Sequence, residues 1–314
     1  MISGLRIGVM GAGAVGGYFG ARLAQMGAVV TLIGRAAHVS AVCEHGLALT
    51  SGGVLTYVPL TASTDVAALA DADVVLVCVK STDTDAAAAS LAPVLSPGAL
   101  IVSLQNGVDN AWRIRERAPQ PVVPAAVYVS AEMTGPGQLL HNGGGQIVVG
   151  RALAADDAAA SERLDRLVAG FEAAGIVCRR SEDIRVDLWT KLTSNCAYNA
   201  ISALTELRYH HLAADAGIGE VMRLVTEENA AVAQADGVPV AIAALHDAVR
   251  RFAEVMPGAL SSTAQDLQRG RRTEIDHLNG YVVRRGLALG VPTPVNRTLL
   301  ALVSLAERTR EVRG

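Results

Sequence analysis

One run near the start of the chain, Gly11-Ala12-Gly13-Ala14-Val15-Gly16, constrains the fold more than any other feature of the sequence. It fits the pattern G-x-G-x-x-G, in which the glycines allow a tight turn, close approach of the backbone to a pyrophosphate, and close packing of helix on strand. The apolar run Leu5–Met10 precedes it, and a stretch of helical character, Ala14–Met26, follows. This order of strand, turn and helix predicts a dinucleotide-binding βαβ unit rather than a chance glycine-rich turn.

The alternation of apolar runs and helical stretches continues through the first half of the chain. Strands are expected at residues 29–33, 73–79, 99–104, 122–129, 146–149 and 176–179, and helices at 83–91 and 157–174. The strands are almost continuously apolar, as expected when helices cover both faces of a parallel sheet. The first half therefore predicts a doubly wound, Rossmann-type α/β domain.

Long helical patterns dominate from about residue 184, with breaks at glycine and proline. A chain of 314 residues is long enough for two domains, each with its own core. We expect an NADP-binding Rossmann-type domain at 1–183 and a mostly α-helical substrate and catalytic domain at 184–314.

Composition excludes several other classes of protein. With 27 basic and 30 acidic residues the net charge is −3, so no basic field favours nucleic acid or an anionic membrane. No apolar run reaches the length of about 18 residues that a membrane span needs. Four scattered cysteines without a CxxC pair favour reduced thiols in a cytoplasmic protein, and neither they nor His210-His211 suggest a metal site. The sequence is compatible with a homodimer.

The choice of dinucleotide follows from charge. A site for NAD usually carries Asp or Glu about 20 residues beyond the glycines, to bind the ribose 2′-hydroxyl. Here the first acidic residue is Glu44, and Arg35 stands at the end of the second strand. Its guanidinium can pair with a 2′-phosphate, which favours NADP, although an ordinary solvated arginine is the alternative.

The chain contains only two lysines, Lys80 and Lys191. Lysine can lose its proton when desolvated, whereas arginine stays charged. Lys80 ends the strand at 73–79, at the edge where doubly wound sheets bind ligands, and Asn106 follows the next strand at the same edge. We interpret both as cofactor or substrate contacts; the alternatives are a solvated lysine and a turn-forming Asn-Gly pair.

Lys191, Asn195 and Asn199 recur at intervals of four residues, so on a helix they share one face. Asparagine is a poor helix former, and this stripe favours a face that lines a cleft over a solvated polar one. Further along, Ser262 has two interpretations, because Gln265 three residues later also fits a helix cap. Glu274 is one of several carboxylates beside an expected buried stripe of Ile275, Leu278 and Val282.

Taken together, these segments resemble the ketopantoate reductase (2-dehydropantoate 2-reductase) family over essentially the whole chain. The matching pieces are Gly11–Gly16, Arg35, Lys80, Gln105-Asn106-Gly107, the Lys191/Asn195/Asn199 helix, Ser261-Ser262, Thr273–Asp276 and Asn279-Gly280. Each is weak alone, whereas their order and spacing as a set are specific.

The resemblance implies a role for each matching residue. Lys191 and Glu274 would be catalytic: Lys191 would donate the proton, and Glu274 would orient Lys191 or a substrate hydroxyl. Asn106, Lys191, Asn195, Asn199 and Ser262 would bind substrate. Lys80, Asn106, Ala131 and Glu274 would contact the cofactor or the reacting groups. The chain departs from the family at Tyr209, near the place of an expected further asparagine, and at Asp83, where an amide can occur.

The hypothesis is therefore reduction of a 2-oxo acid by NADPH in a site between the two domains, with ketopantoate converted to pantoate in pantothenate biosynthesis. Lys191, partly desolvated, would protonate the ketone oxygen. Two alternatives remain: a related NADP-dependent hydroxy-acid dehydrogenase with another substrate, and a non-catalytic sensor of NADPH.

Overall fold

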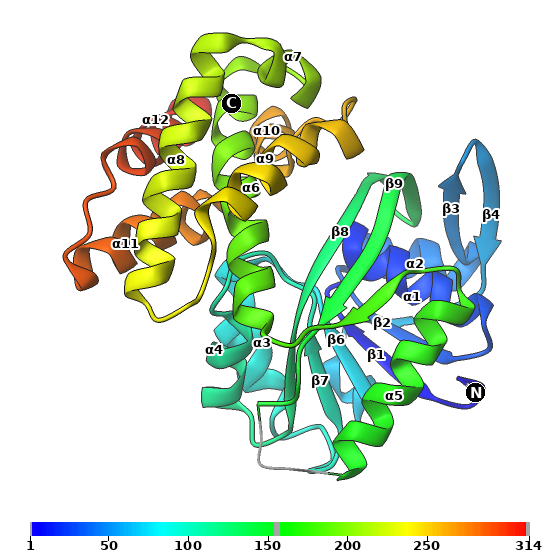
Figure 1. Cartoon of the computed structure of the whole chain (residues 1–314). Coiled ribbons are helices and arrows are strands. Elements are labelled where there is room, and N and C mark those ends of the chain that lie inside the picture. The colour runs from blue at the N-terminus through cyan, green and yellow to red at the C-terminus, as the bar shows by residue number, and fades with distance from the viewer. Residues whose placement is uncertain (1, 154–157, 312–314) are drawn as a thin grey trace. The chain divides into compact units, whose positions relative to one another are not determined.

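The structure is a computed structural model that describes residues 2–153 and 158–311 (Figure 1). The chain forms two compact units. Unit 1 comprises Met1–Gln105 and Asp109–Ile184, and unit 2 comprises Asn106–Val108 and Arg185–Gly314. Three residues that follow Gln105 thus group with the second part of the chain. The assignment of cofactor binding to one range and substrate binding to the other stays a prediction.

Unit 1 is built on a sheet with the strand order β4-β3-β9-β8-β7-β6-β1-β2-β5, and β10 pairs with β9. The strands are β1 (Arg6–Met10), β2 (Val29–Ile33), β3 (Leu47–Ser51), β4 (Val54–Val58), β5 (Thr61–Ser63), β6 (Val74–Val77), β7 (Leu100–Ser103), β8 (Val122–Gly135), β9 (Gln138–Val149) and β10 (Cys178–Arg180). All neighbours from β5 to β8 are parallel, whereas β8 pairs with β9, and β3 with β4, in antiparallel fashion.

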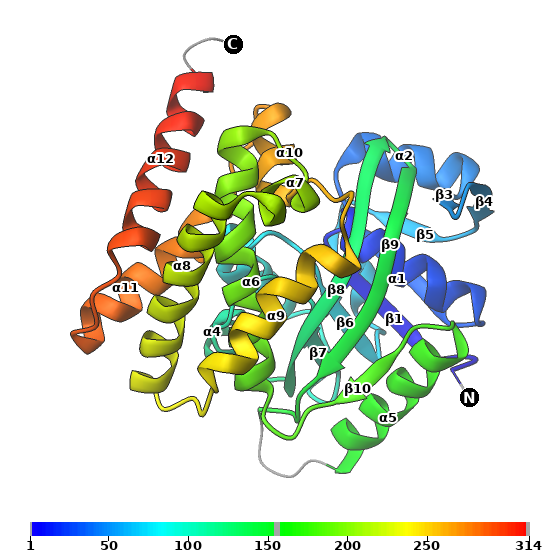
Figure 2. The ribbon, with the colours of Figure 1, turned by 45° about the horizontal axis from the view of Figure 1, so that its top comes forward.

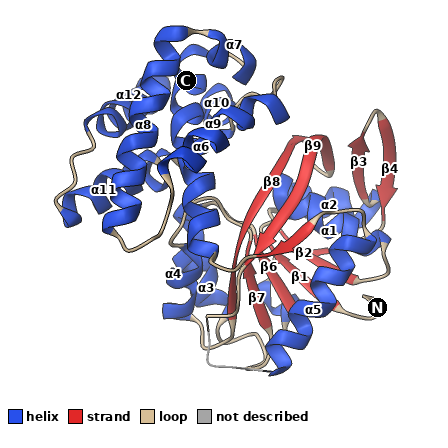
Figure 3. Cartoon of the chain, viewed as in Figure 1, coloured by secondary structure: helices blue, strands red, loops and turns tan. Residues whose placement is uncertain are grey.

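Helices cover both faces of this sheet, as Figure 3 shows. The helices of unit 1 are α1 (Ala14–Gln25), α2 (Ala36–His45), α3 (Thr84–Leu91), α4 (Asn110–Arg117) and α5 (Ala158–Ala173), with 3-10 turns η1 (Val66–Leu69) and η2 (Ser81–Asp83). In β6, Val74 and Leu76 belong to one apolar core, and Val75 and Val77 belong to the other. Burial on both faces explains the continuous apolar runs, and the doubly wound α/β class is confirmed.

Two parts of unit 1 differ from the sequence-based expectation. The separate strands expected at 122–129 and 146–149 are the ends of one long hairpin, β8–β9. Positive φ values at Gly143, Gly144 and Gly145, and register shifts along the hairpin, interrupt the period of two that would have revealed it. The hairpin of β3 and β4 was not expected, because residues 54–57 are all exposed and do not alternate between a core face and a solvent face.

Unit 2 is helical, as predicted. Its helices are α6 (Ile184–Thr205), α7 (Tyr209–Ala214), α8 (Ala216–Ala235), α9 (Ile242–Val255), α10 (Ser262–Gln268), α11 (Asn279–Leu289) and α12 (Pro294–Glu311), with the 3-10 turn η3 (Ile275–His277) (Figure 2). Every residue from Lys191 to Ala203 is buried. A helix enclosed on all sides is a core helix, so the other helices of the unit pack around α6. The expected buried stripe of Ile275, Leu278 and Val282 is confirmed.

Two absences concern residues 2–153 and 158–311 only. In these ranges no helix combines the length and the apolar character needed to cross a bilayer. Within the same ranges, no group of three or more His, Cys, Asp or Glu side chains is arranged to hold a metal ion. His210 and His211 are both exposed and lie ring against ring, with centroids 3.9 Å apart.

Candidate active site

The glycine-rich turn joins β1 to α1, and its backbone is held on the end of β2. The N–H groups of Gly11 and Ala12 donate to the Ile33 carbonyl at 3.2 and 2.8 Å. Gly13 is the N-cap of α1 and supplies no side chain to the helix terminus. The first-turn N–H groups of a helix have no partner within the helix, so residues 13–16 can offer theirs to an anion.

The space beside Gly13 is open, whereas Gly11 is closely packed. A Cβ on Gly13 would meet no protein atom within 4 Å, so the protein itself does not require glycine there. A Cβ on Gly11, in contrast, would lie 2.7 Å from the Val79 backbone nitrogen, and Gly11 has a φ of +105°. The turn therefore packs closely on the end of β6 while the space at Gly13 stays open, which is the arrangement that a dinucleotide pyrophosphate requires.

Three further predicted cofactor residues belong to unit 1. Lys80 comes directly after Val79 and is half-buried, and Arg35 is the exposed N-cap residue of α2, two residues beyond the carbonyl that holds the glycine turn. These two and the turn share the carboxyl edge of the sheet. Ala131 is half-buried in the middle of β8, opposite His141 of β9.

The predicted polar stripe on α6 is buried. Relative exposures are 7% for Lys191, 6% for Asn195 and 3% for Asn199, so the alternative of a solvated stripe is wrong. The other residues of α6 from Leu188 to Ala203 are apolar or small. Burying an amine and two amides costs free energy unless they meet polar partners. Polar groups that are buried despite this cost are typical of functional sites.

Lys191, Asn106 and Glu274 lie together in unit 2. The Lys191 ammonium donates to Asn106 Oδ1 at 2.9 Å, and Asn106 Nδ2 donates to Glu274 Oε2 at 3.3 Å. Burial lowers the pKa of Lys191 to about 8, and the Glu274 carboxylate opposes that shift. Asn106 is therefore more than a turn residue, although Gly107 beside it does have a φ of +94°. A lysine with this pKa exchanges a proton readily near neutral pH.

Asn199 is held by two neighbours that the sequence did not assign to it. The Tyr209 hydroxyl donates to Asn199 Oδ1 at 3.3 Å, and Ser261 Oγ donates to the Asn199 carbonyl at 3.2 Å. Ser261 also caps α10, since its Oγ accepts from the Ala264 N–H at 3.0 Å. The interpretation of Ser262 as the helix cap is wrong, because Ser262 is the exposed first residue of α10.

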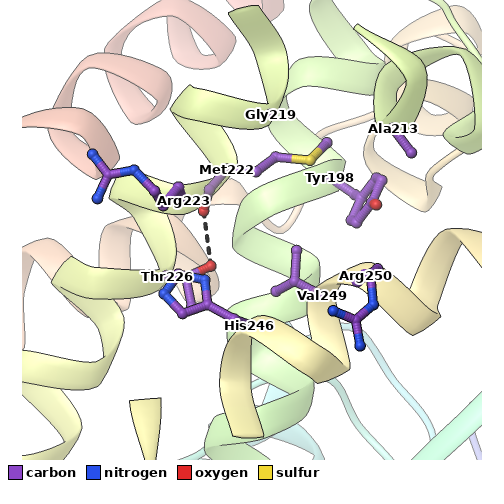
Figure 4. A pocket seen from close by; sticks show the side chains of 9 residues that line it. All are labelled: Tyr198, Ala213, Gly219, Met222, Arg223, Thr226, His246, Val249 and Arg250. Carbon is purple, nitrogen blue, oxygen red and sulfur yellow. Dashed lines mark hydrogen bonds between the residues drawn. The ribbon is translucent and has the colours of Figure 1, made fainter. Parts of the chain in front are cut away.

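A pocket of about 210 Å³ lies elsewhere in unit 2, among α6, α7, α8 and α9 (Figure 4). Tyr198, Thr226 and His246 are among its lining residues, and none of the predicted site residues is. Its two arginines are already paired, Arg223 with Glu220 and Glu227, and Arg250 with Asp247 and Glu254. This pocket is therefore not the site that the Lys191 cluster marks.

Sequence reasoning missed a set of buried polar residues in unit 1. Gln105 Nε2 donates to the Val79 carbonyl at 3.0 Å and to Thr84 Oγ1 at 2.8 Å. Thr84 in turn bonds to Asn110. In the sequence, Thr84 and Asn110 resemble ordinary residues at helix starts, and only their joint burial distinguishes them.

Comparisons with known proteins point to one family. The family model described as ketopantoate reductase PanE/ApbA matches residues 7–153, and that described as ketopantoate reductase PanE/ApbA C terminal matches residues 183–307. The 2-dehydropantoate 2-reductase of Halobacterium salinarum is 35% identical over 97% of this chain and 99% of its own.

Solved structures give the same result. A PanE/ApbA family ketopantoate reductase from Ralstonia eutropha JMP134 is 48% identical, with a TM-score of 0.88, covering 98% of this chain and 99% of that one. A D-mandelate dehydrogenase in complex with NADH is 25% identical, with a TM-score of 0.87, covering 97% and 99% of the two chains.

Fold and site thus define an oxidoreductase that uses a nicotinamide dinucleotide and acts on a CH–OH group. Matches to both family models, together with relatives above 30% identity over nearly the whole chain, are decisive for its membership. The chain belongs to the ketopantoate reductase PanE/ApbA family.

Proposed function

We propose that the chain catalyses the NADPH-dependent reduction of ketopantoate (2-dehydropantoate) to pantoate. The observation that carries the proposal is the buried Lys191 ammonium, bonded to Asn106 and accompanied by Glu274. The names of the relatives supply the substrate. A small-molecule 2-oxo acid is therefore the expected partner.

NADPH would bind to unit 1 through the glycine-rich turn and three further residues. The N–H groups of Gly13–Gly16 would hold the pyrophosphate at the start of α1. Arg35 would pair with the 2′-phosphate, and Lys80 and Ala131 would contact the remainder of the cofactor. The absence of any acidic residue before Glu44 supports NADPH over NADH.

When bound, the nicotinamide would supply the hydride that the ketone carbon needs. Lys191 would stabilise the negative charge that develops on the ketone oxygen and then transfer a proton to it, leaving a neutral amine that solvent reprotonates. Asn106 and Glu274 would keep the ammonium in place and charged. Asn195, Asn199 and Ser262 would bind the carboxylate and hydroxyl groups of the substrate.

The direct test is a steady-state assay of NADPH oxidation with purified protein and ketopantoate, repeated with NADH. We expect turnover with NADPH and a much lower kcat/KM with NADH. Binding of NADPH without turnover of any 2-oxo acid would instead identify a sensor of the cofactor and refute the proposal.

One observation favours a second substrate class. A D-mandelate dehydrogenase shares the fold. An apolar or aromatic 2-oxo acid is therefore the second candidate, and a panel that compares ketopantoate with benzoylformate decides between them by kcat/KM.

A further inference from the structure

Four buried polar side chains form a connected network at the carboxyl edge of the sheet in unit 1. We call Ser81, Thr84, Gln105 and Asn110 the strand-end network. Their relative exposures are 0% for Ser81 and Thr84, 5% for Gln105 and 3% for Asn110. They come from two neighbouring connections, the one that follows β6 and the one that follows β7.

The hydrogen bonds of the network join these two connections. Thr84 Oγ1 donates to Asn110 Oδ1 at 2.8 Å and accepts from Gln105 Nε2 at 2.8 Å. Asn110 Nδ2 donates to Ser81 Oγ at 3.1 Å. At the rim, Arg113 donates to the Ser81 carbonyl at 3.0 Å and to Asn110 Oδ1 at 3.1 Å.

Lys80 lies between two residues that the network holds. On one side, Gln105 Nε2 donates to the Val79 carbonyl at 3.0 Å. On the other, Ser81 is bonded through its hydroxyl and its carbonyl. The backbone on both sides of Lys80 is therefore fixed, and the same Gln105 directly precedes Asn106 in the chain.

A buried network of this kind has a large effect on geometry. Each neutral polar group would cost free energy if its partner moved away, so neither connection can shift without breaking several bonds at once. Packing alone does not require it, because apolar side chains of the same shape would fill the space without a desolvation cost.

We propose that the strand-end network is a positioning device that holds Lys80 in the geometry that binds the nicotinamide dinucleotide. Thr84 is its central positioning residue, since its hydroxyl links Gln105 to Asn110. The inference rests on the proposed function, because it takes Lys80 as a cofactor contact.

Thr84→Val tests the proposal, since valine keeps the shape and removes the hydroxyl. Binding is measured directly from the fluorescence of NADPH during titration, so no substrate is needed. We expect Thr84→Val to raise the Kd of NADPH about tenfold, and Thr84→Ser, which retains the hydroxyl, to stay within about twofold of the unchanged protein. Ser103→Ala, a milder change that removes a donor to Gln105 Oε1 at 3.1 Å, should give a smaller rise in Kd.

Thr226→Val is the matched control. Thr226 is also completely buried, but its hydroxyl donates to the Met222 carbonyl of its own helix at 2.8 Å (Figure 4). This variant should bind NADPH as the unchanged protein does, with any loss of Tm comparable to that of Thr84→Val.

Two results would overturn the inference while the proposed function stands: wild-type Kd in both Thr84→Val and Ser103→Ala, or equal weakening by Thr84→Val and Thr84→Ser. Failure of the unchanged protein to bind NADPH at all would instead refute the proposed function, and the inference with it. If Thr84→Val does not fold, the Kd of NADPH for Ser103→Ala decides the question: a rise supports the inference, and an unchanged Kd overturns it.

Discussion

The Lys191 ammonium donates a 2.9 Å hydrogen bond to the side-chain oxygen of Asn106, a residue 85 positions earlier in the chain. An ammonium can only donate, so this contact fixes which end of the Asn106 amide faces Lys191. The amide nitrogen then faces Glu274, to which it donates at 3.3 Å. One neutral amide thus bridges a buried ammonium and the Glu274 carboxylate.

Removal of the amine should slow turnover strongly and leave binding of the cofactor intact. We expect Lys191→Ala to lower kcat for ketopantoate by about 10²-fold or more, because the proton donor and the charge that stabilises the oxyanion are both lost. The Kd of NADPH, measured by fluorescence titration, should change little. Turnover close to that of the unchanged protein would refute the role of Lys191.

The pH dependence of reduction should follow the Lys191 proton. Because burial lowers the pKa of Lys191 to about 8, the ammonium is present below that pH and is lost above it. We expect kcat for ketone reduction to fall about tenfold per pH unit above that pKa, and oxidation of pantoate by NADP to accelerate over the same range. Stopped-flow measurement from pH 6 to 10 checks this, and a flat profile for reduction would contradict it.

The same burial should make Lys191 destabilising. Its pKa falls from 10.5 to about 8 on folding, so between these values the unfolded chain binds more protons and stability rises with pH. Below that window the full cost is present. We expect Lys191→Met to raise the free energy of unfolding at pH 7 by about 1 to 3 kcal/mol. Urea melts at pH 7 and 10 test this; an advantage that does not shrink at pH 10 would point to packing instead.

Arg35 should determine the preference for the phosphorylated cofactor. Arg35→Ala is expected to raise the KM of NADPH about tenfold or more and to leave that of NADH unchanged, because only NADPH carries the 2′-phosphate. Arg115→Ala removes an exposed arginine of the same unit and serves as the control. Equal effects on both cofactors would exclude specific pairing with the phosphate.

A substitution at Gly13 should weaken the binding of NADPH without lowering the stability of the fold. Its φ of −80° is ordinary and a methyl group there meets no protein atom within 4 Å, so Gly13→Ala should keep the Tm of the unchanged protein. The methyl group would occupy the space proposed for the pyrophosphate, so we expect the Kd of NADPH to rise about tenfold or more. Thermal melts and titration together check this; unchanged binding would place the pyrophosphate elsewhere.

Much of unit 1 could be predicted because its signals are local. The glycine-rich turn and the apolar runs of β1, β2, β6 and β7 each carry their own pattern, and burial on both faces makes that pattern continuous. The β3–β4 hairpin gave no such signal. Val54, Leu55 and Tyr57 are all exposed, so β4 lacks the alternation of buried apolar and exposed polar residues that marks a strand.

The site was predictable only in part, for a related reason. Spacing placed Lys191, Asn195 and Asn199 on one face, but no local pattern links Lys191 to Asn106. The choice between Ser261 and Ser262 as helix cap depends on backbone geometry: Ser261 is extended, with φ −62° and ψ 151°, and its Oγ can reach the Ala264 N–H. Two adjacent serines look alike in the sequence.

Because residues 106–108 belong to unit 2, the chain passes between its two units three times, after residues 105, 108 and 184. A fragment starting at Arg185 would retain Lys191 and Glu274 but lack the amide that joins them. Any chimera that exchanges the helical half at residue 184 must therefore also take residues 106–108 from the same parent, because a mismatched loop would remove the hydrogen bond between Lys191 and Asn106.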